Sequence, residues 1–177
     1  MARYFFDTEF IEDGKTIELI SIGVVCEDGR EFYAENANAV LSNANDWVKE
    51  NVFPHLWSRS TDEVRATANK WSRDGGTGGL LYYSDIAKDL RRWINEGKDT
   101  PEFWAYYADY DWVALCQLYG AMVDLPEGWP MFCLDLKQWC YQLGDPRLPE
   151  QTSTEHHALA DARWNFEVYK FLNNYHI

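Results

Sequence analysis

The sequence has no apolar run close to the roughly 20 residues needed to cross a bilayer. Its N-terminus also lacks the charged-then-apolar pattern of a signal peptide. The four cysteines lie far apart and form no C-x-x-C pair: Cys26, Cys116, Cys133 and Cys140. We therefore expect a soluble protein whose buried thiols stay reduced in a cytoplasm.

Positive charge is scarce. The chain has 16 Lys and Arg against 29 Asp and Glu, which gives a net charge of −13. Proteins that grip duplex backbone by releasing counterions need the opposite balance, so any nucleic-acid contact here should be local. Carboxylates that collect divalent cations can still bind phosphate, because the ions reverse the sign of the local field. Acidity alone decides nothing, since solvated acidic surfaces are common.

What the chain does contain is apolar mass for one packed core. Its 177 residues are 46% hydrophobic and 16% aromatic, and neither a repeat nor a separating linker is visible, so we expect a single domain over 1–177. Strands are predicted at 3–11, 15–25, 30–35 and 102–108, with turn signals at 13–14 and 27–29. The first three strands should form an antiparallel meander.

Helices are predicted between and after these strands, which gives an α/β sandwich. Their ranges are 42–52, capped by Asn43 or Asn45, then 84–96, capped by Ser84, and 111–118, 135–143 and 155–173. Residues 57–79 have no clear period, and the four glycines at 75–79 are expected to form a flexible loop.

Three groups of polar residues stand out against this background. Asp7 and Glu9 are two apart on the first strand, so both side chains should face one site about 7 Å apart. Asp111 follows the strand 102–108, where ligand groups collect in open α/β sheets, although Asp109 competes for the role. Asp161 lies on the final predicted helix. Each group alone has an ordinary explanation as a surface or capping residue.

Histidine completes the pattern. His156 precedes Asp161 by five residues, and on a helix that spacing puts the imidazole about a turn and a half from the carboxylate, with both able to reach one cleft. The order D-x-E, then D, then H-x-x-x-x-D resembles the DnaQ-like exonucleases of the DEDDh type. The segments FFDTEFIEDGKTIELISIGVV, YADYDWVALCQLYG and HHALADAR look like the bacterial polyadenylate-specific 3′-exoribonuclease AS group.

The resemblance implies a ribonuclease-H-like mixed sheet, an antiparallel meander plus parallel strands, flanked by helices. It implies a 3′-5′ exoribonuclease that releases nucleoside 5′-monophosphates from single-stranded RNA, with a preference for adenylates. It also implies a homodimer in the cytoplasm of a bacterium or a phage-infected cell. Asp7, Glu9, Asp111 and Asp161 match the family's metal ligands, and His156 matches its general base. His157 stands where the sister class has tyrosine.

The chemistry of these residues agrees with the resemblance. Four carboxylates can hold two Mg²⁺ or Mn²⁺ ions, and their hard oxygens disfavour zinc. An imidazole, with an ordinary pKa of about 6.5, can take a proton from an attacking water near neutral pH.

The candidate substrate contacts are aromatic. Phe10 and Trp112 could stack on terminal bases or simply belong to the core. Tyr107 stands where many such enzymes have asparagine, so substrate contacts near Asp111 are expected to differ. Two alternatives stay open: a DNA 3′-5′ exonuclease of proofreading or repair type with the same site, and a catalytically silent nucleic-acid-binding module.

Overall fold

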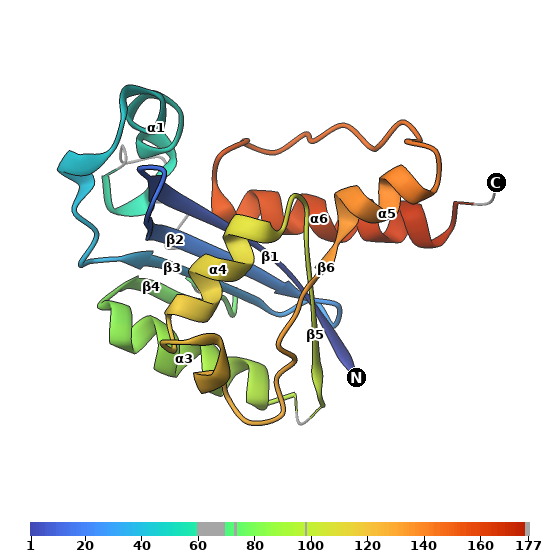
Figure 1. Ribbon diagram of the computed structural model, residues 1–177, viewed down its shortest axis with the longest axis horizontal. Helices are drawn as coiled ribbons and strands as arrows, with labels where there is room; N and C mark the ends of the chain where they lie inside the picture. Colours follow the sequence, from blue (N-terminus) through green and yellow to red (C-terminus); the bar gives the residue numbers. More distant parts are fainter. Residues whose placement is uncertain (60–69, 73, 98, 176–177) are drawn as a thin grey trace.

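The computed structural model describes residues 1–59, 70–72, 74–97 and 99–175 (Figure 1). Its centre is a six-stranded sheet with the order β4-β3-β2-β1-β5-β6. The strands are β1 (Ala2–Glu12), β2 (Ile17–Cys26), β3 (Glu31–Asn36), β4 (Thr77–Leu81), β5 (Pro101–Ala105) and β6 (Leu134–Asp135). Strands β1 to β3 form the predicted antiparallel meander. The other three pair in parallel with their neighbours, β4 with β3, β5 with β1 and β6 with β5. This mixed sheet confirms the expected fold class.

Helices cover both faces of the sheet (Figure 1). They are α1 (Asp46–Asn51), α3 (Tyr83–Asn95), α4 (Asp109–Gln117), α5 (Leu136–Gln142) and α6 (Ala158–Asn173). Short 3-10 turns occur at η1 (Leu41–Asn43), η2 (Phe53–His55), η3 (Trp57–Arg59) and η4 (Met122–Asp124). The main core lies between the sheet and α3 and α4. A second cluster lies between the sheet and α6.

The second half of the glycine-rich segment is a strand, so the loop predicted there is wrong for Gly78 and Gly79, whereas Gly75 and Gly76 lie outside the strand. Gly78 and Gly79 belong to β4 with positive φ angles of 128° and 135°. A Cβ on Gly78 would lie 1.9 Å from the carbonyl oxygen of Tyr33 in β3, so glycine permits the close approach of the two strands. Part of the segment predicted to be irregular, residues 60–69, lies outside the described residues.

Several predicted boundaries also move. The helix predicted to start at Ser84 begins at Tyr83, with Tyr82 as its N-cap and no side-chain cap bond. Strand β5 ends at Ala105 rather than at residue 108, and α4 begins two residues before Asp111. In α1, Asn45 is the cap, and its side chain accepts a hydrogen bond from the Val48 amide.

The alternation of side chains along β1 divides its residues between the two faces. Phe5 stacks on Phe166 of α6, with ring centroids 4.6 Å apart, whereas Phe6 belongs to the core under α3 and α4. Gly23 of β2 lies opposite Asp7, and a Cβ there would come within 2.3 Å of the Leu159 amide nitrogen. This glycine therefore lets the start of α6 lie directly on the sheet beside Asp7.

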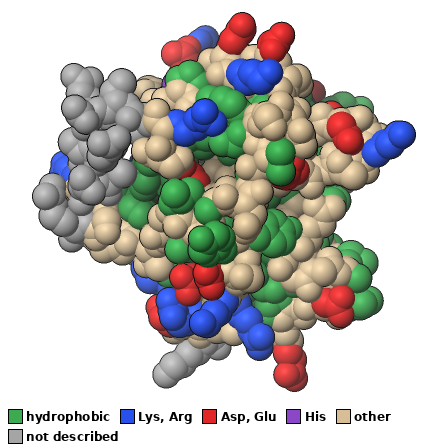
Figure 2. Space-filling model, turned by 90° about the vertical axis from the view of Figure 1, so that its left-hand side faces the viewer, with side chains coloured by type: hydrophobic (Ala, Val, Ile, Leu, Met, Phe, Trp, Pro, Cys, Tyr) green, Lys and Arg blue, Asp and Glu red, His purple; other side chains and the backbone are tan. Residues whose placement is uncertain are grey.

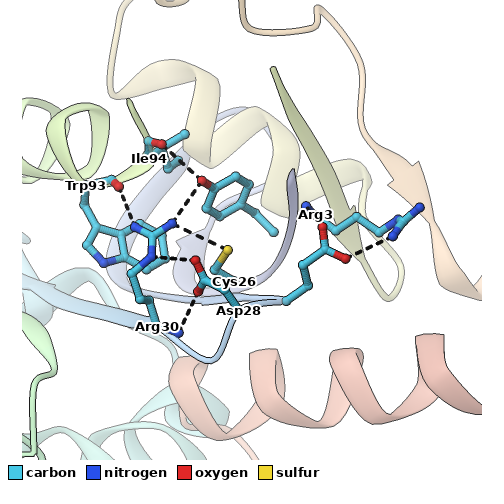
Figure 3. Close-up of polar contacts among 8 residues, drawn as sticks. Arg3, Cys26, Asp28, Arg30, Trp93 and Ile94 are labelled. Atoms are coloured by element: carbon cyan, nitrogen blue, oxygen red, sulfur yellow. Dashed lines mark hydrogen bonds and ion pairs between the residues drawn. The ribbon is translucent and has the colours of Figure 1, made fainter. Parts of the chain in front are cut away.

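A polar network fastens the β2–β3 turn to the end of α3 (Figure 3). Arg30 donates to Asp28 at 2.8 Å and to the carbonyl oxygen of Trp93 at 2.9 Å. The Tyr4 hydroxyl donates to the carbonyl oxygen of Ile94 at 3.1 Å. Because the last carbonyls of a helix lack intrahelical partners, these bonds satisfy the C-terminal end of α3. The network is structural and lies at the end of β1 remote from Glu9.

No helix among the described residues is both long and apolar enough to span a membrane. Figure 2 shows hydrophobic side chains near the centre of one face of the molecule, with charged side chains mainly toward its rim. The exposed large hydrophobic residues of the chain include Val40, Trp47, Leu80 and Tyr82. Trp47 also lines a cleft.

Candidate active site

Three carboxylates meet at the boundary between β1 and α6. Asp7 and Glu9 project from the face of β1 that α6 covers, and Asp161 is in the first turn of α6. One oxygen from each carboxylate can be chosen so that all three lie within 4.8 Å of one another. The prediction that Asp7 and Glu9 face one site is confirmed. A register shift between Glu9 and Phe10 interrupts the regular pairing of β1 with β2 at this point, as β-bulges often do beside functional sites.

Asp111 approaches the same cleft from α4. It is only 6% exposed, and its Oδ1 accepts hydrogen bonds from the Thr8 amide at 2.9 Å and the Thr8 hydroxyl at 2.5 Å. Thr8 lies between Asp7 and Glu9 but faces the other side of β1, so it fixes Asp111 relative to both. The structure brings Asp111 to the cleft, whereas Asp109 is exposed and is not among the lining residues.

His156 lines the cleft, but it does not lie on the helix as predicted. Helix α6 begins at Ala158, and His156 precedes it with a left-handed φ of 61°. The helix starts late because the N-cap is His157, whose Nδ1 accepts a hydrogen bond from the Ala160 amide at 3.4 Å. The ring of His156 packs edge-on against Trp47 of α1, with centroids 4.9 Å apart.

His157 points away from the cleft. Its ring stacks on Tyr33 at 4.6 Å and lies 5.3 Å from Trp57. Burial lowers the pKa of His157 to about 4, so this imidazole stays neutral near neutral pH. The capping bond and the stacking indicate a structural role for His157.

The carboxylates resist ionisation in this setting. Burial, with the neighbouring Asp161 and Asp111, raises the pKa of Glu9 to about 8. Burial raises the pKa of Asp111 to about 7, although the hydrogen bonds from Thr8 oppose the shift. The pKa of Asp7 is raised well above its ordinary range, first by burial and then by Asp111 and Glu9. Burial also raises the pKa of Asp161, against the opposing effect of a hydrogen bond from Gln151.

The described part of the chain brings no Lys or Arg to offset these charges. Among its residues, no Lys or Arg lines the cleft or the adjoining recess. Like charges at this separation cannot all stay ionised without a cation. Four carboxylates with no Lys or Arg beside them form the hard-oxygen donor set that suits Mg²⁺ or Mn²⁺. The residues present therefore fit a divalent-cation site.

Aromatic rings line the cleft, whose volume is about 330 Å³. Phe10 stacks on Tyr110 with centroids 5.9 Å apart and planes 15° from parallel. Tyr107 is 64% exposed and has a left-handed φ of 58°. Trp47 is also exposed. Trp112 instead packs in the core against Phe103. The sequence left base stacking and core packing open for Trp112, and the structure supports core packing.

The structure places three further residues here that sequence reasoning did not assign to the site. Trp47 lies on α1, far along the chain from the carboxylate motifs, so the sequence does not indicate that it belongs to the site. Tyr110 directly precedes Asp111, and that adjacency was the one usable signal. Gln151 donates its side-chain amide to Asp161 from an irregular segment with no periodic pattern.

The mixed sheet and the acidic cleft define an α/β protein with a carboxylate cluster that suits divalent cations. The family model for the 3′-5′ exoribonuclease Rv2179c-like domain matches residues 2–172. The chain belongs to this family.

Two curated relatives come from Mycobacterium tuberculosis: the 3′-5′ exoribonuclease Rv2179c of strain H37Rv and the 3′-5′ exoribonuclease MT2234.1 of strain CDC 1551. Each is 40% identical to this chain over 173 residues, which cover 97% of this chain and 94% of the relative. Among solved structures, Pop2p of S. pombe in its Mg²⁺- and Mn²⁺-bound form has a TM-score of 0.48 and 12% identity, and the match covers 98% of this chain and 83% of that one.

Proposed function

We propose that this protein is a two-metal 3′-5′ exoribonuclease that releases nucleoside 5′-monophosphates from single-stranded RNA. One observation carries the proposal: four carboxylates from three separate elements converge on one cleft that has no Lys or Arg among its described lining residues. Family membership supports the direction of degradation and the RNA substrate.

Asp7, Glu9, Asp111 and Asp161 would hold two Mg²⁺ or Mn²⁺ ions. Bound there, the cations supply Lewis-acid activation of the attacking water and neutralise charge on the leaving oxygen. The protein's own contribution is to align the carboxylates. Thr8 does this for Asp111 through two hydrogen bonds.

His156 would act as the general base. It lines the cleft together with Asp7 and Asp161, and no hydrogen bond within the described structure occupies its ring nitrogens. A ring held only by packing against Trp47 stays free to accept the proton of the attacking water. General-base help of this kind typically accelerates a reaction by about 10² to 10⁴-fold.

The cleft suits one terminal nucleotide of a single strand. Its volume of about 330 Å³ lies at the lower end of the range for small-ligand sites. Phe10 and Tyr107 at its rim could stack on bases, a contact worth about 1 to 3 kcal/mol per base. Stacking favours purines over pyrimidines because their rings are larger, which agrees with a preference for adenylates.

Paired degradation assays test this function. The wild-type protein should shorten a 5′-labelled oligoadenylate RNA from its 3′ end in Mg²⁺ or Mn²⁺ and release AMP, and it should act more slowly on the DNA of matched sequence. A strict preference for the DNA strand would favour the proofreading or repair type of exonuclease. Absence of monophosphate release in Mn²⁺ would indicate a silent binding module.

The metal requirement has its own control. EDTA should abolish the activity, and Ca²⁺ should not restore it, because its longer and more flexible coordination binds phosphate without the geometry for attack. Full activity in EDTA would contradict the mechanism.

The organisation of the protein in the cell is proposed on the family resemblance. We infer a homodimer of single-domain subunits that acts in the cytoplasm. A second subunit could bring basic residues to a cleft whose described lining has none. Analytical ultracentrifugation at micromolar concentration tests this inference. We expect a dimer, and a monomer would exclude this arrangement.

A further inference from the structure

The segment that carries His156 is fastened to α6 at two points. After α5 the chain returns alongside α6 as an irregular segment, residues 143–157, before the helix begins (Figure 1). Trp164 of α6 donates its indole N–H to the carbonyl oxygen of Pro149 at 3.0 Å. Two residues further on, the side-chain amide of Gln151 donates to Oδ1 of Asp161. His156 follows five residues later.

Gln151 stands beside the carboxylates, in a recess of about 240 Å³ that Asp7, His156 and Asp161 also line. Its amide lies 3.4 Å from the Ser153 hydroxyl as well. Within the described part of the chain, no other side chain donates a hydrogen bond to Asp7, Glu9 or Asp161. An amide is neutral and cannot repel or replace a cation, so its effect here is to orient the Asp161 carboxylate.

The direction matters because repulsion from the neighbouring carboxylates favours turning Asp161 away from them, against the backbone amides of His156 and His157, which also act on this carboxylate. Its neighbours Asp7 and Glu9 bear like charge when ionised, and the side chain is only half-buried, so rotation toward water would relieve the repulsion. A donor on Oδ1 opposes that rotation. Hydrogen bonds that orient a ligating carboxylate from outside the metal site are typically worth about 10 to 100-fold in metal affinity or activity.

We propose that Gln151 is a positioning residue that holds the Asp161 carboxylate toward Asp7 and Glu9 and so prepares the cation site. This inference rests on the proposed function, because it assigns Asp161 to a cation. The same bond ties the segment that carries His156 to α6, so the cation ligand and the histidine share one anchor.

Mn²⁺ alone is the probe, titrated into the full chain without nucleic acid and followed by calorimetry or by the electron paramagnetic resonance of the free ion. Gln151→Leu and Gln151→Met remove the donor while keeping a side chain of similar size. Gln117→Leu is the matched control, since Gln117 is exposed on α4. We expect the Kd for Mn²⁺ to rise about 10 to 100-fold in both Gln151 variants and to stay at the wild-type value in the control.

The outcomes separate this inference from the proposed function. If the wild type itself binds no Mn²⁺, the proposed function fails and this inference fails with it. If the wild type binds and a Gln151 variant binds within twofold of it, only the positioning role is overturned. A lower Tm without cation, together with unchanged Mn²⁺ affinity, would also overturn that role and leave Gln151 a structural anchor. Because Gln151 lines an open recess, both variants should fold, and either one alone decides the question.

Discussion

Replacing Glu9 by glutamine should stabilise the cation-free protein while removing its activity. Glu9 is 8% exposed and faces Asp7 and Asp161 across less than 4.8 Å. Glutamine keeps the volume and the polarity of the side chain but cannot ionise, so it ends the cost of a buried charge without a counter-charge. Gain of stability with loss of function is the usual signature of a site shaped for a ligand.

The magnitude follows from the shifted titration of this carboxyl. The ordinary pKa of a glutamate is 4.5, and that of Glu9 in the folded protein is about 8. This difference corresponds to a loss of folding free energy of roughly 5 kcal/mol at most. Neighbouring carboxyls can take up protons in its place, so we expect about 1 to 3 kcal/mol. The folded state holds the proton more tightly than the unfolded state. The wild type is therefore penalised little below pH 4.5, and the penalty grows as the pH rises toward 8.

Thermal unfolding in EDTA between pH 5 and pH 9 measures this difference. The Tm of Glu9→Gln should exceed that of the wild type by about 3 to 10 °C at pH 8, with a small difference at pH 5. Mn²⁺ at pH 8 should raise the Tm of the wild type more than that of the variant. Glu50→Gln, on the exposed surface of α1, is the control and should change little. A Tm for Glu9→Gln at or below the wild-type value at pH 8 would refute this account of the cleft.

Three further residues, two of them with a neighbouring residue as control, test the separate roles in the cleft. His156→Ala should lower kcat by about 10² to 10⁴-fold with little change in Mn²⁺ affinity, whereas His157→Ala should chiefly lower the Tm, and reversed effects would exchange their roles. Asp111→Asn should remove most activity and Asp109→Asn should not, as initial rates in Mn²⁺ will show. Phe10→Ala should raise the KM for RNA on the order of 5 to 150-fold if it stacks on a base, and an unchanged KM would assign it to packing alone.

The sequence was sufficient for the meander because local signals there agree with one another. Turn residues at 13–14 and 27–29 separate three runs of β-forming residues, and these became β1, β2 and β3 with small shifts in their ends. Strand β4 could not be predicted in the same way. Its glycines give no periodic signal, and the need for Gly78 comes from its close approach to the backbone of Tyr33, a contact that only the folded sheet creates.

The start of the last helix shows a different limit. The apolar spacing from Leu159 onward indicated the helix correctly, but spacing does not show where a helix begins. The predicted start was too early because the side chain of His157 caps the helix. Histidine is not among the residues that usually cap helices. The expected geometry of His156 was wrong for this reason, even though the residue does line the cleft.

The residues of the site also differ in whether local sequence was enough to predict them. Asp7 and Glu9 could be assigned to one face because two residues on a strand share a face by geometry, and nothing outside β1 was needed. Gln151 reaches the same cleft from an irregular segment and bonds to Asp161, whereas Trp47 reaches it from a short helix and contacts the ring of His156. Both contacts depend on how the folded sheet brings these segments together. The strand spacing therefore predicts residues that could bind cations, while the tertiary packing determines which neighbours hold those residues in place.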